Sequence, residues 1–540
     1  MRVVLYDTSL RDGAQMEGIS YSVEEKLEIT RRLDELGVDY IEGGWPGSNP
    51  KDAEYFQRVQ RLPLKHATIA AFSSTRRANS PVAEDPNITA LVESGAPVCT
   101  LVGKAWDLHV HKVLKTTINE NLAMITDSIA YLRAQGRRVF FDAEHFFDGY
   151  QANPKYALAC VKAAAKAGAE CIVLCDTNGG ALTQALVDAI RQVQAQVRVE
   201  LGIHVHNDCE LAVANSLAAL QAGVVQVQGT INGYGERCGN ANLTSLVAVL
   251  KAKLGVDCVT DEQLAKLTEI SRYVNELANL RPDPRQPFVG LNAFTHKAGL
   301  HADAVGKIEE SYQHIPPQLV GNQKRVLVSE LAGRANIVQK AQELGIALEA
   351  TDPRVRAILQ RVKQMESLGY QYEGAEASFE LLIRRMEEGY APPFELVDFM
   401  VVVEKHRRAP SLGNGEEVLS EATVKVRVND SIIHTAAEGN GPVNALDGAL
   451  RKAVSQYYPA LAVVRLVDYK VRILEGTDGT EAQVRVLIES TDGEQTWRTV
   501  GSSTNIIEAS WFALVDAVEY WLVRKGLVGQ MAPTMEPVIG

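Results

Sequence analysis

Short apolar runs alternate with longer stretches of helical periodicity through the first half of the chain. Eight runs rich in β-branched and aromatic residues predict strands at Val3–Tyr6, Tyr40–Gly43, Ala67–Phe72, Val98–Val102, Val139–Ala143, Cys171–Cys175, Val199–His206 and Val225–Thr230. Amphipathic patterns between them predict helices, among them Val23–Leu36, Asn119–Ala134, Pro154–Ala167 and Leu182–Gln194. Because parallel strands need helix-length crossovers, this alternation predicts a parallel sheet.

The number of strand–helix units favours a closed sheet. Eight units in roughly 250 residues are what a (β/α)8 barrel, or TIM barrel, requires. An open, doubly wound sheet is the alternative, but it would normally carry a glycine-rich dinucleotide turn after its first strand. Asp7, Arg11 and Asp12 occupy that turn here. We therefore expect an α/β fold whose first domain, residues 1–270, is a TIM barrel.

Polar residues recur where the predicted strands end. In a TIM barrel these C-terminal ends form the face that carries the active site. In strand order the residues are Arg11, Asp12, Glu42, Asp142, Glu144, Asp176, Thr177, His204 and His206, and the loop Gly233–Asn242 follows the eighth strand. Each has an ordinary packing explanation when taken singly, but their collection at one rim predicts a functional site.

The triplet His204-Val205-His206 is the strongest chemical signal in the chain. Residues i and i+2 of a strand project from the same face, so two imidazoles point into one space. Such a pair can hold a divalent metal, or it can consist of satisfied core histidines. Asn207 and Asp208 follow directly and make the strand end polar, which favours the metal interpretation.

The second half of the chain has a different pattern. Residues 271–405 are mainly helical, with one polar break at Thr295–Asp303, and Glu404–Glu417 is typical of a linker. Residues 406–540 contain an internal duplication of two β-β-α units, with helices expected near Pro442–Tyr457 and Ile506–Lys525. We expect an α+β domain with its own core, which senses a ligand or dimerises and performs no chemistry.

Composition excludes several classes of function. With 46% hydrophobic and 23% charged residues, the chain is typical of soluble globular proteins. A net charge of −12 argues against a general nucleic-acid or anionic-membrane binder. No apolar run is long enough to span a bilayer, and Val3–Leu5 is far too short for a signal peptide. The seven cysteines include no C-x-x-C pair, so a reducing, cytoplasmic setting is expected.

Three motifs in order give the chain a family resemblance. Leu10–Gln15 with Lys26 matches the first signature of the isopropylmalate synthase and homocitrate synthase family, which belongs to the DRE-TIM metallolyases. His204–Asp208 matches the second signature, and Gly233–Ala241 resembles the family's Gly-x-Gly-Glu-Arg-x-Gly-Asn-Ala loop. The duplicated C-terminal domain is similar to the regulatory domain of isopropylmalate synthases. Within the family, Phe141–Gly149 is similar to the citramalate synthase branch.

The resemblance implies a reaction and a cofactor. The family carries out a Claisen condensation of acetyl-CoA with an α-keto acid, followed by thioester hydrolysis. The citramalate synthase branch uses pyruvate and serves isoleucine biosynthesis. A cation chelated by the keto acid needs mixed carboxylate and imidazole ligands, which is compatible with Mg, Mn or Zn. By motif match the metal ligands are Asp12, His204 and His206, with Asn240 as a further or outer ligand.

The motif match also implies roles for the remaining site residues. Arg11 would donate to the ketone oxygen as it becomes an alkoxide, and Thr177 would bind the keto acid carboxylate. Glu144 would orient the acetyl group or assist proton transfer. His301, in a Gly-Leu-His match, would help to remove the methyl proton of acetyl-CoA, accompanied by Tyr312. In this family such residues can reach the barrel of a partner subunit, so we expect a homodimer, with isoleucine as feedback inhibitor.

One departure and several alternatives accompany the resemblance. The family usually has Gly two residues after the Asn-Asp pair, whereas this chain has Glu210. Isopropylmalate synthase is the nearest alternative function, followed by homocitrate synthase and a hydroxymethylglutaryl-CoA lyase, which lacks the duplicated domain. A non-enzymatic amino-acid sensor would not need the ligand set. Phe140, Phe146 and Phe147 are candidates for closing the pocket around the small methyl group of pyruvate, with ordinary core packing as the alternative.

Overall fold

The computed structural model describes residues 3–296, 304, 308, 311–326, 334–349, 351–405, 418–474 and 482–527. The chain divides into two compact units. The first comprises Met1–Phe294 with His314–Lys324, and the second comprises Thr295–Gln313 with Arg325–Gly540. Within the described part of the chain, no helix combines the length and the apolar character that crossing a bilayer requires.

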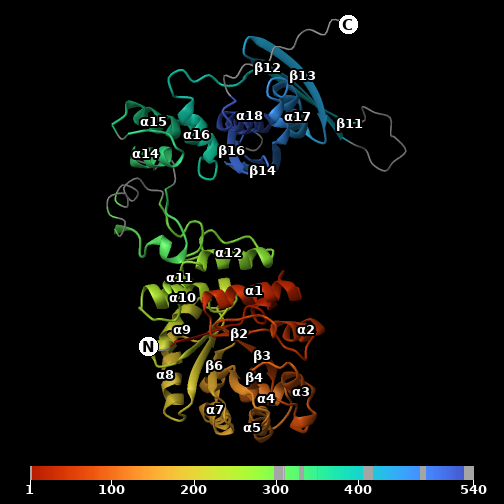
Figure 1. The fold of residues 1–540 in the computed structure, drawn as a ribbon, viewed down its shortest axis with the longest axis vertical. Coiled ribbons are helices and arrows are strands. Elements are labelled where there is room, and N and C mark those ends of the chain that lie inside the picture. Colours follow the sequence, from red (N-terminus) through yellow and green to blue (C-terminus); the bar gives the residue numbers. More distant parts are fainter. Residues whose placement is uncertain are drawn as a thin grey trace, which may run out of the picture. The chain divides into compact units, whose positions relative to one another are not determined.

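Eight parallel strands of the first unit close into a barrel (Figure 1). They are β1 Val4–Asp7, β2 Tyr40–Glu42, β3 Thr68–Ser74, β4 Val98–Lys104, β5 Arg138–Glu144, β6 Cys171–Asp176, β7 Glu200–Val205 and β8 Gln226–Gly229. The barrel closes between its first and last strands, because Tyr6 of β1 pairs in register with both Tyr40 of β2 and Gln228 of β8. The predicted TIM barrel is confirmed, and the open-sheet alternative is excluded.

Helices surround the barrel on its outside (Figure 1). They are α1 Val23–Leu36, α2 Pro50–Val59, α3 Pro86–Glu93, α4 Asp107–Lys112, α5 Ile118–Ala134, α6 Phe146–Ala152, α7 Pro154–Ala167, α8 Thr183–Gln194, α9 Ala212–Gln221, α10 Leu243–Ala252, α11 Asp261–Leu264 and α12 Leu267–Leu277, with 3-10 turns at Gly13–Gln15, Val82–Glu84, Ile231–Gly233 and Pro317–Val320. Local chemistry sets the ends of α1: Ser22 and Glu25 form a reciprocal capping box, and Gly37 ends the helix at φ 87°.

Two layers of apolar side chains hold the barrel together. The larger layer packs the outer faces of the strands against the helices. The smaller fills the barrel interior with Tyr6, Ala70, Val98, Phe140, Cys171, Val173 and Cys175. Interior packing of this kind makes a TIM barrel a solid core and leaves space only at the strand ends. The polar residues at the C-terminal ends therefore lie above an apolar floor.

The second unit begins with short elements and three helices. β9 Thr295–His296 pairs in parallel with β10 Arg325–Val326. Helices α14 Arg334–Glu343, α15 Pro353–Ser367 and α16 Glu376–Arg384 follow. They share a small core that includes Ile337, Ile358 and Phe379.

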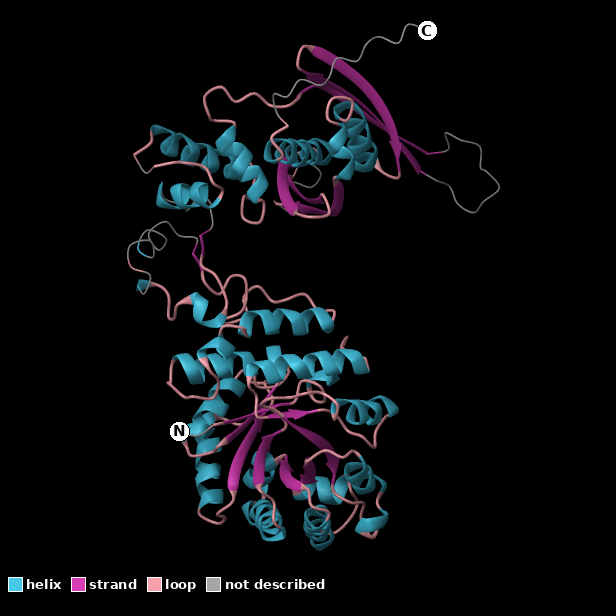
Figure 2. Ribbon diagram, in the orientation of Figure 1, coloured by secondary structure: helices cyan, strands magenta, loops and turns pink. Residues whose placement is uncertain are grey.

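The C-terminal part of this unit contains two three-stranded antiparallel sheets, each followed by a helix (Figure 2). The first group is β11 Glu395–Lys405, β12 Val418–Val428, β13 Ser431–Gly439 and α17 Pro442–Val454. The second is β14 Arg465–Ile473, β15 Val484–Thr491, β16 Thr496–Ser503 and α18 Ile506–Arg524, with a 3-10 turn at Pro459–Val463 between the groups. The predicted duplication is confirmed.

Each repeat has one strand more than the β-β-α pattern predicted. β11 falls in the region expected to be helical and in the first residues of the expected linker. Its unbroken apolar run, Phe399–Val403, does not distinguish a strand from a buried helix. β16 ends in Gly501-Ser502-Ser503, whose composition favours a turn. Close packing requires the small residue there: a Cβ at Gly501 would lie 2.0 Å from the Ala509 carbonyl oxygen in α18.

Candidate active site

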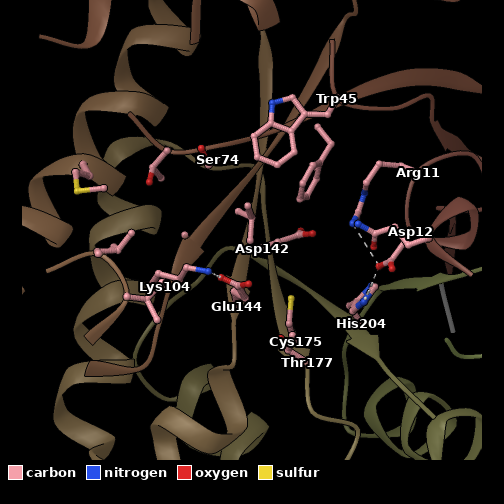
Figure 3. Close-up of a pocket in the computed structure, with 18 of the residues that line it drawn as sticks. Arg11, Asp12, Trp45, Ser74, Lys104, Asp142, Glu144, Cys175, Thr177 and His204 are labelled. Carbon is pink, nitrogen blue, oxygen red and sulfur yellow. Dashed lines mark hydrogen bonds and ion pairs between the residues drawn. The ribbon is translucent and has the colours of Figure 1, made fainter. Parts of the chain in front are cut away.

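A cavity of about 600 Å³ opens at the C-terminal ends of the barrel strands. Its walls come from the ends of β3 to β7 and from the loops after β1, β2 and β8 (Figure 3). Arg11, Asp12 and His204 lie together on one side, Lys104 and Glu144 lie on the other, and Asp142 stands between them (Figure 3). The cavity therefore brings together most of the polar residues that the strand-end pattern predicted.

Asp12, His204 and His206 form a compact cluster of potential metal ligands. Their ligand atoms all lie within 4.8 Å of one another. Asp12 Oδ2 is 3.4 Å from His204 Nε2 and 4.0 Å from His206 Nε2. The three residues are buried, with exposures of 3%, 5% and 6%. The alternation of a strand places both imidazoles on the inner face of β7 and its extension, opposite the turn that carries Asp12.

The electrostatics of this cluster suit a cation. Burial lowers the pKa of His204, and burial together with the neighbouring His204 lowers the pKa of His206 to about 4. Burial by itself would raise the pKa of Asp12, but Arg11 and the two imidazoles outweigh it and lower that pKa. Both imidazoles are therefore neutral and the carboxyl is ionised near neutral pH. These are the protonation states that metal coordination requires.

Two buried polar atoms in or next to the cluster have no hydrogen-bond partner among the described residues. Asn240 donates through Nδ2 to the carbonyl oxygen of Tyr234 at 2.9 Å, and its Oδ1 has no partner. His206 Nδ1 has none either. An unmatched buried polar atom costs about 1–3 kcal/mol. A carboxylate, two imidazoles and an amide oxygen are a donor set that fits a divalent cation.

The glycines of the loop after β8 explain how Asn240 reaches this position. Gly235 has a φ of 149°, and a Cβ there would lie 2.2 Å from Asn240 Nδ2. Gly239 has a φ of 82°, and its Cβ would lie 1.9 Å from the Gly233 carbonyl oxygen. Side chains at either position would push the loop away from the cluster. The spacing of glycines in this motif is thus a packing requirement of the site.

Arg11 is held in place by three neighbours. Its Nε donates to Glu42 Oε1 at 2.5 Å, and its Nη1 lies 3.4 Å from Asp12 Oδ2. The guanidinium carbon lies 3.9 Å from the centre of the Phe72 ring. Glu42 is fully buried and also accepts a hydrogen bond from Tyr6 at 2.8 Å. Arg11 therefore presents a fixed positive charge next to the metal ligands.

The opposite wall carries a second charged pair. Lys104, the last residue of β4, contacts the Glu144 carboxylate at the end of β5 through an ion pair. The nearby Thr177 accepts a hydrogen bond from the His145 backbone amide at 2.9 Å, which leaves the threonine hydroxyl proton available for a ligand. The pattern predicted Glu144 and Thr177 but missed Lys104, because the predicted fourth strand ended two residues early, at Val102.

Two predicted residues are not tested by this geometry. His301 lies outside the described residues. Tyr312 is a residue of the second unit and is 49% exposed. Lys26, which belongs to the first signature, is placed by the structure away from the ligands: it is buried and its Nζ contacts Asp52 Oδ1 at 2.5 Å. Its role is to tie α1 to α2.

The expectation that Phe140, Phe146 and Phe147 close the pocket is wrong. Phe140 packs in the barrel interior, and the other two belong to the outer core. The chain turns outward at His145, which has a φ of 54°, so the residues after it face the helices. Trp45 and Phe72 line the cavity instead, with ring centres 5.7 Å apart in an edge-to-face contact.

Comparisons with known proteins agree with this geometry. Residues 2–274 match the model of the HMGL-like family, residues 288–369 a homocitrate synthase post-HMGL domain-like model, and residues 373–522 the LeuA allosteric (dimerisation) domain. The chain is 54% identical to an (R)-citramalate synthase of Geobacter sulfurreducens, over 97% of the chain and 98% of the relative. It is 52% identical to an (R)-citramalate synthase of Synechocystis, over 98% of each. Among solved structures, an HMG-CoA lyase of Bacillus subtilis matches with a TM-score of 0.44 and 19% identity, over 52% of this chain and 94% of that one.

Proposed function

Because the chain belongs to the HMGL-like family, and within it to the (R)-citramalate synthases, we propose that it condenses acetyl-CoA with pyruvate and hydrolyses the resulting thioester to (R)-citramalate and CoA. The observation that carries the proposal is the cluster of Asp12, His204 and His206 beside Arg11 in the barrel cavity. The reaction is the acetyl-transfer step of isoleucine biosynthesis. Catalysis is assigned to residues 1–270, and regulation to 406–540 together with β11.

The ligand cluster and Arg11 share the task of activating the ketone. A divalent Mg, Mn or Zn ion held by Asp12, His204, His206 and Asn240 would supply Lewis-acid polarisation of the keto acid. Arg11 points its guanidinium into the same space, where it donates hydrogen bonds to the ketone oxygen as negative charge develops on it. Since Glu42 and Phe72 already fix the guanidinium, little reorganisation is needed in the transition state.

The opposite wall binds the rest of the reactants. Thr177 has its hydroxyl proton free to donate to the pyruvate carboxylate. Glu144, oriented by Lys104, faces the acetyl group. His301, accompanied by Tyr312, takes a proton from the acetyl methyl group. The resulting carbanion forms the new C–C bond to the ketone carbon, the alkoxide is protonated, and water cleaves the thioester to release CoA.

Regulation is proposed for the C-terminal repeats. The match to a LeuA allosteric (dimerisation) domain supports a homodimer and an effector, for which we propose isoleucine. His301 lies outside the described residues. As part of the proposal, this histidine reaches the active site in the barrel of the partner subunit.

Release of CoA across a panel of α-keto acids tests the function. With a thiol-reactive dye as readout, pyruvate should give the highest kcat/KM, and 2-oxoisovalerate and 2-oxoglutarate should be poor substrates. An apolar pocket separates substrates that differ by a methylene only about 10- to 200-fold, so slow turnover of 2-oxobutanoate is expected. A preference for 2-oxoisovalerate would assign isopropylmalate synthase activity instead. No CoA release with any keto acid would favour a non-enzymatic sensor.

A further inference from the structure

Gln228 connects a metal ligand to the substrate wall. It lies in β8, and its side chain is completely buried. Its Oε1 is 3.0 Å from His204 Nδ1, and its Nε2 is 3.3 Å from Asp142 Oδ1. Asp142 lines the cavity between the two charged walls (Figure 3). One amide group therefore bridges the ligand cluster and the cavity surface.

The orientation of the Gln228 amide indicates which atom donates to which. In the structure Gln228 Nε2 donates to Asp142 Oδ1, and Gln228 Oε1 faces His204 Nδ1. An amide oxygen has no proton to give, and His204 Nδ1 must therefore carry one. The remaining nitrogen, Nε2, keeps its lone pair and is the atom that lies 3.4 Å from Asp12 Oδ2. The hydrogen bond thus fixes the tautomer that a metal ligand needs.

The two histidines of the cluster differ in this respect. His204 is oriented through Gln228, whereas His206 Nδ1 has no hydrogen-bond partner in the part of the chain that the structure describes. The barrel therefore orients the His204 ring through a side-chain hydrogen bond that the His206 ring does not have among these residues. A neutral amide also suits the surroundings, because Asp142 and Glu42 are already buried nearby and a further carboxylate would repel them.

We propose that Gln228 is a positioning residue of the condensing site: it holds His204 in the metal-binding tautomer and fixes Asp142 at the wall of the cavity. The proposal rests on the proposed function, since it assumes that the cluster binds a divalent cation. Outer partners of metal-bound histidines typically change metal affinity by about 10- to 100-fold when they are removed. Gln228 has a second partner, so its substitution should affect the metal and the substrate separately.

Two variants separate these effects. Gln228→Leu removes both hydrogen bonds at similar volume. Gln228→Glu keeps an acceptor for His204 but loses the donor to Asp142 and adds a charge beside it. Gln226→Leu is the matched control: Gln226 lies two residues earlier on the same strand and is 2% exposed, and its Oε1 has no hydrogen-bond partner among the described residues, so the same change should leave the site intact.

Binding of Mn²⁺ to the purified full-length protein is measured from the free-ion EPR signal in the absence of substrates. We expect Gln228→Leu to weaken binding about 10- to 100-fold. Gln228→Glu should stay within a few-fold of the parent in Mn²⁺ affinity but lose about tenfold or more in kcat/KM for pyruvate. Gln226→Leu should match the parent in both. Thermal unfolding of each variant reports whether it is folded.

The outcomes distinguish the proposal from the proposed function. If folded Gln228→Leu binds Mn²⁺ as tightly as the parent, or if Gln226→Leu weakens binding equally, Gln228 does not position the ligand. If Gln228→Leu does not fold, Gln228→Glu provides the test. An equal loss of Mn²⁺ affinity and of kcat/KM in that variant would contradict separate roles of Gln228 toward His204 and toward Asp142. If the parent protein turns over pyruvate without binding Mn²⁺ or any other divalent ion, the metal site itself is wrong, and the inference falls with it.

Discussion

Each compact unit of the protein places an arginine between two buried acids, and the two clusters differ in how completely their polar atoms are paired. In the second unit, Arg385 Nη2 lies 2.6 Å from both Asp516 Oδ1 and Glu519 Oε2. Hydroxyl groups satisfy the other carboxylate oxygens: Ser378 donates to Asp516 Oδ2 and Tyr390 to Glu519 Oε1, each at 2.6 Å. Each of the four carboxylate oxygens of Asp516 and Glu519 therefore has a partner, and we call this cluster the closed network.

The barrel cluster is open. Arg11 contacts Glu42 and Asp12, but within the described part of the chain the neighbouring His206 Nδ1 and Asn240 Oδ1 have no hydrogen-bond partner. Buried charge alone therefore does not identify a functional site, since the closed network is equally charged. Both clusters border a cavity, so the distinguishing feature of the barrel cluster is its unused coordination capacity. Predictions that separate the two clusters follow from this difference.

The largest expected effect is on the open cluster. Asp12→Ala or His206→Ala should reduce CoA release from acetyl-CoA and pyruvate by about 10²–10³-fold or more, because each removes a donor from the cation that stabilises the developing charge. Thermal unfolding of the metal-free proteins should change much less than activity, because Arg11 keeps its ion pair with Glu42 when Asp12 is replaced. Chelation should abolish the parent activity, and added metal should restore it. Full activity in excess chelator without added metal would contradict the ligand assignment.

The closed cluster should show the opposite behaviour. Arg385→Leu leaves two buried carboxylates without their cation, and breaking a buried ion pair typically costs about 3–5 kcal/mol. Because the Arg385 side chain is 39% exposed, we expect the free energy of unfolding of the second unit to fall by about 2–3 kcal/mol. The urea-unfolding transition of that unit measures the loss. Mn²⁺ binding by the barrel should be unchanged below that transition. A loss of Mn²⁺ affinity without a loss of stability would show that the closed network serves the site.

The barrel could be predicted because its pattern is local. Helices α1 and α7 begin and end at the residues expected from periodicity and capping, and the predicted strands fall on the eight strands observed. The third strand of each C-terminal repeat could not be predicted in the same way. Whether β11 is a strand depends on its pairing with β12, a contact between residues such as Val401 and Ala422 that lie far apart in the sequence.

The clustering of Asp12, His204 and His206 could be predicted from motif order, but its supports could not. The burial of Gln228 between His204 and Asp142 depends on the register of β8 against its neighbours. Phe140 was assigned to the pocket because it shares a strand face with Asp142, yet it lies deeper in the barrel, where interior packing encloses it. Periodicity gives the face of a strand but not the height along the barrel at which the cavity begins.

An effector experiment tests whether the second unit acts on the first. Isoleucine should inhibit CoA release with a coupling of about 1–3 kcal/mol, roughly a 5- to 150-fold change in apparent affinity for pyruvate, and leucine should act more weakly. Coupling of binding is reciprocal, so saturating pyruvate should weaken isoleucine binding by the same factor in calorimetry. Asp12→Ala should still bind isoleucine, because the effector site is assigned to the repeats. Identical responses to isoleucine and leucine would contradict the proposed effector.

The smallest expected effect concerns the second charged pair of the cavity. Lys104→Met keeps the aliphatic stem and removes the ammonium group that orients the Glu144 carboxylate. Both side chains are about one-quarter exposed, at 24% and 22%, so water partly replaces the lost contact. We expect kcat to fall about tenfold, which corresponds to about 1.4 kcal/mol, with a smaller change in the KM for pyruvate. Lys104→Arg should recover most of the rate, because it restores the charge. A change confined to the KM for pyruvate would mean that Lys104 binds the keto acid directly and does not act through Glu144.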